Sequence, residues 1–126
     1  MGIKNMLNRH YRIIEIGNKK RLLIDFDEKK YEILSIFLEC EVYEFEEWIK
    51  EIFDKVLSGE SEFEEMHGNV CGAEISRNTT KILDDLAKDG MEDWCEIDTK
   101  ELRMLIDDWS ENLRKFKLHY GKENCC

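Results

Sequence analysis

The pattern of apolar and polar residues begins with two short alternating segments. Isoleucines alternate with polar residues in 12–16, and apolar residues do the same in 21–26. The four residues between these segments, 17–20, begin with Gly17-Asn18, a pair typical of a tight turn that needs positive φ. The chain is therefore predicted to begin with a β-hairpin.

Helical spacing of apolar residues follows the hairpin. Apolar side chains recur every three or four residues in 27–41 and more clearly in 45–57, and Gly59 lies just beyond the second segment, as a helix C-cap would. A third helix is predicted to start at Asp98, because Asp98 and Glu101 have the spacing of a capping box. The apolar stripes of these helices place three aromatic residues in the core: Trp48, Phe53 and Trp109.

Four short segments between the second and third helices are typical of strands. They span 61–66, 70–76, 79–83 and 94–97, and turn signals such as Gly68-Asn69 separate them. The predicted order is β-β-α-α-β-β-β-β-α. We expect an α+β fold in which about three helices pack on one antiparallel sheet of about five or six strands.

The length of 126 residues favours one domain, and no linker is visible because the chain has no proline and no Gly/Ser-rich tract. We expect a single globular domain over 1–126, with 1–10 and 119–126 loosely ordered.

The net charge of −10, from 29 acidic and 19 basic residues, disfavours direct binding to nucleic acid or to an anionic membrane. No apolar run approaches the roughly 18–20 residues that span a bilayer. The first residues also lack the apolar stretch of a secretory signal. A cytoplasmic location is the expectation.

Candidate chemistry is sparse. The five cysteines include no C-x-x-C pair and are expected to be reduced thiols, and the three histidines form no H-E-x-x-H motif. No cofactor or metal is expected. A small enzyme or metal-binding domain remains an alternative, in which His67 would activate Cys71, or Asp25 and Asp27 would bind a cation.

The charge is divided unevenly along the chain. Residues 1–30 have eight bases and four acids, whereas 39–65 have eleven acids and two bases, and 84–108 have ten acids and three bases. Many of these acids fall in predicted turns and short strands, where a clustered negative potential would attract a basic partner. The candidate binding residues are these acids and one aromatic neighbour: Glu60, Glu62, Glu64, Glu65, Asp84, Asp85, Asp89, Glu92, Asp93 and Trp94.

Several short runs resemble a known family. They are Phe45-Glu46-Glu47-Trp48-Ile49, Val56 to Glu60, Gly68-Asn69, Glu74-Ile75, Cys95 to Leu102, and Trp109. Together they resemble the immunity proteins of bacterial contact-dependent growth inhibition systems, over about residues 22–110.

The resemblance implies an inhibitor without catalytic residues that binds the C-terminal toxin domain of a cognate effector. Such toxins are often nucleases that cut transfer RNA, and some of them use elongation factor Tu. An acidic inhibitor would cover the basic surface with which a nuclease binds RNA. A further alternative is an acidic mimic of nucleic acid that binds another basic partner. This interpretation does not explain the basic residues of 1–30.

Overall fold

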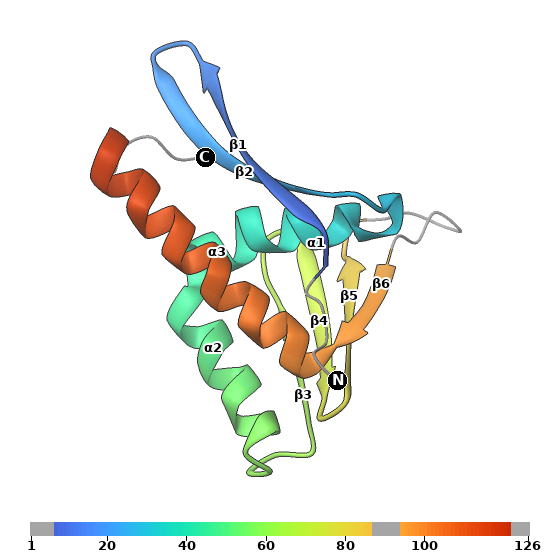
Figure 1. Ribbon diagram of the computed structural model, residues 1–126. Coiled ribbons are helices and arrows are strands. Elements are labelled where there is room, and N and C mark those ends of the chain that lie inside the picture. The colour runs from blue at the N-terminus through green and yellow to red at the C-terminus, as the bar shows by residue number, and fades with distance from the viewer. Residues whose placement is uncertain (1–6, 87–93, 122–126) are drawn as a thin grey trace, which may run out of the picture.

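The computed structural model describes residues 7–86 and 94–121 (Figure 1). The predicted hairpin is confirmed as β1 (Arg9–Ile16) and β2 (Lys19–Phe26), which pair antiparallel. Its turn has two residues rather than four, because Ile16 pairs with Lys19 and Gly17 adopts a φ of 63°. The strands are therefore longer than the alternating pattern suggested.

The two helices expected in 27–57 form one continuous helical segment, so the order is β-β-α-β-β-β-β-α and the prediction of three helices is wrong. The segment consists of a 3-10 turn (Lys29–Tyr31), α1 (Glu32–Ile36), a π-helical turn (Phe37–Val42) and α2 (Tyr43–Leu57). It bends at Phe45, where φ is −123° and ψ is 37°. No proline or glycine occurs between residues 28 and 57, so nothing ends the first helix before the second begins.

The remaining strands form a second sheet, so the single sheet of five or six strands is also wrong. Strands β3 (Phe63–His67), β4 (Cys71–Ser76), β5 (Thr79–Asp84) and β6 (Trp94–Asp98) are ordered β3-β4-β5-β6, all antiparallel. The hairpin stays separate because helices lie between it and this sheet (Figure 1). Glu39 also accepts a hydrogen bond from Ile24 N–H of β2 at 2.9 Å, which occupies that strand edge.

The last helix, α3 (Thr99–Tyr120), begins as predicted. The Asp98 side chain accepts a hydrogen bond from Glu101 N–H at 3.0 Å. The expected stop of α2 is also confirmed, because Gly59 lies just after the helix with a φ of 87°. Local capping signals therefore located two helix ends correctly.

The core lies between the helices and the four-stranded sheet. Phe53 and Trp109 are buried as predicted, but Trp48 is 43% exposed. The buried stripe of α2 is Ile49, Ile52, Phe53 and Val56. Trp48 lies beside this stripe and packs edge-to-face on Phe45 instead.

Regular structure includes residues near both ends of the chain. Arg9 and His10 belong to β1, and His119 and Tyr120 belong to α3, whereas 1–6 and 122–126 lie outside the described residues. Within the described chain, no helix has the length and apolar character needed to cross a membrane.

Candidate functional site

One face of the four-stranded sheet packs on the helices, and the other face is not covered by any described residue. In β4, Cys71, Ala73 and Ile75 point into the core and are fully buried. The strand register assigns the opposite direction to the alternate residues, which we call the outer face. The outer face consists of Phe63, Glu65, His67, Gly72, Glu74, Ser76, Thr79, Lys81, Leu83, Trp94, Glu96 and Asp98.

The middle row of the outer face is acidic. Glu65 lies opposite Glu74, Glu74 opposite Lys81, and Lys81 opposite Glu96. The Lys81 ammonium lies over the Trp94 ring, 4.5 Å from its centroid. Neither Glu74 nor Glu96 forms an ion pair with a residue that the structure describes. Like charges directly opposite are unfavourable across a strand pair, and Glu65 and Glu74 nevertheless lie opposite each other on this face.

His67 connects Glu65 to one further acid, Asp85, at one end of this face. Its Nδ1 lies 2.7 Å from Asp85 Oδ2, and its Nε2 lies 2.8 Å from Glu65 Oε2. The hydrogen bond that the His67 ring forms with the Asp85 carboxylate, and after it the bond with the Glu65 carboxylate, raise the pKa of His67. The ring lies across Gly72, where a Cβ would come within 2.5 Å of Nδ1. Glycine at position 72 therefore allows His67 to reach Asp85.

Two exposed aromatic rings flank the acids. Phe63 is 50% exposed and Trp94 is 45% exposed, from the two outermost strands β3 and β6. A shallow depression of about 160 Å³ lies beside Phe63, and its lining also includes Glu74 and Glu96. Aromatic side chains are frequent anchors in protein interfaces.

The structure brings together only some of the predicted binding residues. Glu65, Asp85 and Trp94 lie on or beside the outer face. Glu64 and Asp84 occupy strand positions that point toward the helices and are half-buried. Glu60 and Glu62 lie in the loop before β3 and are exposed. Asp89, Glu92 and Asp93 fall outside the described residues.

Three central residues of the face were missed: Glu74, Lys81 and Glu96. The signal that could have found them is the alternation of each strand, since each lies next to a buried residue of the same strand. Charge counts over blocks of sequence do not separate the two faces of a strand.

A buried carboxylate holds the β3–β4 turn in place. Glu41, from the π-helical turn, is fully buried and accepts hydrogen bonds from the backbone N–H groups of Asn69, Val70 and Cys71 at 2.6–2.9 Å. A Cβ at Gly68 would overlap this carboxylate, so the turn needs glycine there. Glu41 therefore connects the helical segment to the strands that present Glu65, His67 and Glu74.

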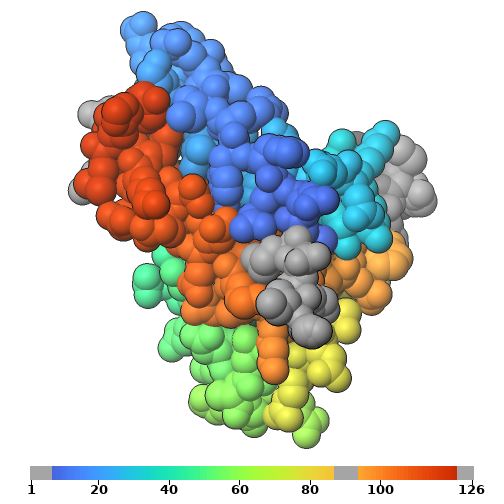
Figure 2. Space-filling view, in the orientation of Figure 1, coloured from blue at the N-terminus to red at the C-terminus, as the bar shows by residue number. Residues whose placement is uncertain are grey.

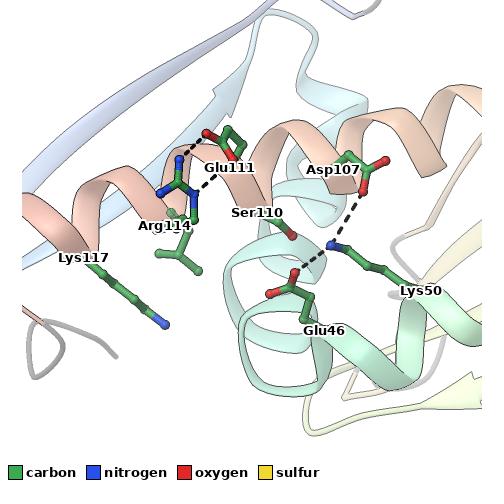
Figure 3. A pocket seen from close by; sticks show the side chains of 8 residues that line it. Glu46, Lys50, Asp107, Ser110, Glu111, Arg114 and Lys117 are labelled. Atoms are coloured by element: carbon green, nitrogen blue, oxygen red, sulfur yellow. Dashed lines mark hydrogen bonds and ion pairs between the residues drawn. The ribbon is translucent and has the colours of Figure 1, made fainter.

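A groove of about 650 Å³ lies between α2 and α3 (Figure 3). Most of its charges pair with one another. Lys50 lies 2.7 Å from Glu46 and 3.6 Å from Asp107, and Arg114 lies 2.6 Å from Glu111. Because these paired charges offset one another, the groove has a weaker electrostatic potential with which to attract a charged partner than the outer face has.

The residues of the alternative chemistry are separated or engaged. Cys71 points into the core, where burial raises the pKa of its thiol, whereas His67 lies on the outer face. Asp25 pairs with Arg12, and Asp27 pairs with His10 at 2.8 Å. Among residues 7–86 and 94–121, no group of three or more histidine, cysteine or acidic side chains could hold a metal ion. The geometry supports neither a thiol nucleophile nor a cation site at these residues.

Comparison with known proteins points to a binding function. An immunity protein from Bacillus cereus is 41% identical over 95 residues, which are 75% of this chain and 81% of the relative. No protein-family model and no solved structure matches the chain. On the strength of this relative, the chain belongs to the immunity proteins, and its partner is a cognate toxin.

Proposed function

We propose that this immunity protein neutralises the C-terminal toxin domain of a contact-dependent growth inhibition effector, and that the toxin is a nuclease that cuts transfer RNA. The supporting observation is the outer face, on which Glu65, Glu74 and Glu96 form one row with a single lysine and lie between exposed Phe63 and Trp94. The proposed site of action is the cytoplasm, where transfer RNA and elongation factor Tu are available to the toxin.

The chemistry of this face suits a basic partner. A nuclease presents lysine and arginine side chains to the phosphates of its substrate. Glu74 and Glu96, which have no described ion-pair partner, are available to the same side chains. Clustered negative potential raises the association rate of a basic partner by roughly 10–1000-fold. Bound there, the immunity protein excludes RNA by occupying its binding surface, and no catalytic step is needed.

Co-expression tests the function. The toxin domain encoded immediately upstream is produced in cells with the wild-type chain, with Glu74→Lys/Glu96→Lys, or with no immunity protein. We expect intact transfer RNA and growth with wild type, and cleaved transfer RNA with the double variant at equal protein levels. No protection by the wild-type chain would refute the function, and full protection by a folded double variant would move the interface elsewhere.

The role of elongation factor Tu in cleavage by the toxin is tested by a separate measurement. Purified toxin domain is assayed on transfer RNA with and without the factor, and then with the immunity protein added. We expect the factor to accelerate cleavage and the immunity protein to stop it in both cases. A cleavage rate that does not change with the factor would show that the factor is not needed by the toxin. The proposed inhibition by the immunity protein would still stand.

A further inference from the structure

The depression on the outer face lies at one end of the four-stranded sheet, beside the turn between β4 and β5. Ser76 and Thr79 are the residues on either side of this turn, and Phe63 of β3 pairs with Ser76. The short side chains of Ser76 and Thr79 leave a hollow between longer neighbours. The lining comes from two neighbouring rows of the face, which are Phe63, Ser76 and Thr79 in one row and Glu74, Lys81 and Glu96 in the next.

Five of these six side chains are available to a partner. The Phe63 ring is 50% exposed and has no ring contact with another described residue. The hydroxyls of Ser76 and Thr79 form no hydrogen bond with any residue that the structure describes. Glu74 and Glu96 have no ion-pair partner in the same part of the chain. The depression therefore combines an aromatic wall, two free hydroxyls and two free carboxylates.

The sixth side chain, Lys81, directs its charge elsewhere. Its ammonium lies 4.5 Å from the centroid of the Trp94 ring. Trp94 pairs with Leu83, which is two residues along β5 from Lys81 in the direction away from Thr79. The ammonium is therefore held toward the other end of the face. The two glutamates that flank Lys81 keep their negative charge for a partner.

The size of the depression fits one side chain. Its volume is about 160 Å³, whereas pockets for small molecules have roughly 300–1,000 Å³. In Figure 2 the segment that joins β4 to β5, in yellow, lies at the surface, at the end of the molecule farthest from the β1–β2 hairpin. The basic residues of that hairpin are thus remote from the depression and do not offset its charge.

We propose that the depression receives one arginine side chain of the toxin. A guanidinium is planar, carries five N–H donors and stacks on aromatic rings, whereas a lysine ammonium is a strongly hydrated point charge. The Phe63 ring provides the stacking surface, and the carboxylates of Glu74 and Glu96 provide the opposite charge. The hydroxyl oxygens of Ser76 and Thr79 accept further N–H bonds. The inference rests on the proposed function only for the identity of the protein that carries the arginine.

Two small compounds test the depression without the toxin. N-acetyl-arginine methylamide and its lysine counterpart are titrated into the isotope-labelled full chain and followed by NMR. We expect saturable shifts of the Phe63 ring and of the Ser76 and Thr79 amides, with the arginine compound bound at least about 3-fold more tightly. Equal affinities for the two compounds, or shifts elsewhere on the protein alone, would overturn the proposal.

Two substitutions at one position separate filling of the depression from loss of a hydroxyl. Ser76→Leu fills the floor without a change in charge and should abolish binding of the arginine compound. Ser76→Ala leaves the depression open and should keep the affinity within about 2-fold of wild type. Unchanged binding by a folded Ser76→Leu variant would contradict the assigned site.

The same variants test the arginine of the toxin. Ser76→Leu should weaken binding of the purified toxin domain at least about 10-fold, and Ser76→Ala less than about 3-fold. One arginine-to-lysine replacement in the toxin should cause a similar loss with the wild-type chain and no further loss with Ser76→Leu. Equal affinity of wild type and Ser76→Leu would overturn the inference and leave the proposed function standing. No binding of the toxin by the wild-type chain would refute the proposed function and, with it, the source of the arginine, whereas the compound titration tests the depression independently.

Discussion

The carboxylate of Glu41 accepts a hydrogen bond from the backbone N–H of Val70 at 2.6 Å, across 29 positions of sequence. The same carboxylate also holds the N–H groups of Asn69 and Cys71. A helix residue thereby fixes the turn from which β3 and β4 diverge. Because these strands present Glu65, His67 and Glu74, the geometry of the outer face depends on a residue that lies outside it.

Replacing Glu41 with glutamine should destabilise the fold. Oε1 accepts from Asn69, and Oε2 accepts from Val70 and Cys71, so an amide NH₂ would face at least one N–H in either orientation. A buried donor left unsatisfied costs about 1–3 kcal/mol. We expect Glu41→Gln to lower the free energy of unfolding by about 2–3 kcal/mol, measured by urea denaturation. Glu44→Gln, at an exposed position on the next helical turn, should change it by less than about 0.5 kcal/mol. Equal stabilities for the two variants would contradict the assigned bonds.

The His67 cluster predicts a pH dependence. Asp85 and Glu65 raise the pKa of His67, so the ring stays protonated to a higher pH than an ordinary histidine. A raised pKa means that the stabilising contribution is fully present below the ordinary value of about 6.5 and is lost as pH rises through the folded value. NMR titration of the ring should therefore give a midpoint above about 6.5.

Gly72→Ala supplies the structural check on that titration. The added Cβ would collide with the His67 ring and with Asp85, so the contact between them would open. The midpoint should move back toward the ordinary value. A midpoint that is ordinary in the wild type, or the same in both proteins, would mean that Asp85 does not hold the ring.

Trp94 should contribute to affinity more than to stability. Its ring is 45% exposed and stacks under the Lys81 ammonium. If it anchors the toxin, Trp94→Ala should weaken binding by about 2 kcal/mol, roughly 30-fold, mostly through faster dissociation. Trp48→Ala removes an equally exposed tryptophan from α2 and is the matched control. Surface plasmon resonance with the toxin domain measures the affinity of both variants. Equal losses of affinity would show that Trp94 is not an anchor.

The parts of the fold that follow local rules were predictable. Gly17-Asn18 located the hairpin, and Asp98 with Glu101 located the start of α3. The division into two sheets was not predictable, because it depends on contacts such as Glu39 with Ile24 between distant segments. The exposure of Trp48 was not predictable either. It follows from the way α2 packs, since the stripe that α2 buries begins at Ile49.

The candidate site shows the same limit. Glu65, Asp85 and Trp94 were chosen from acidic blocks of sequence, and the structure places them on or beside one face. Glu74 and Glu96 were missed because their proximity depends on the register, which sets both opposite Lys81. The residues of this row are far apart in the sequence, because they come from four different strands, and only strand pairing brings them together.

The central claim, that the outer face is the surface that binds the toxin, is tested most directly by one association rate constant. Stopped-flow mixing with the purified toxin domain compares Glu74→Lys/Glu96→Lys with Glu47→Lys/Glu51→Lys on α2, two variants with the same change in net charge. The outer-face variant should associate at least about 10-fold more slowly than wild type, whereas the α2 variant should stay within about 2-fold. Equal slowing by both variants, or slowing by the α2 variant alone, would contradict the account.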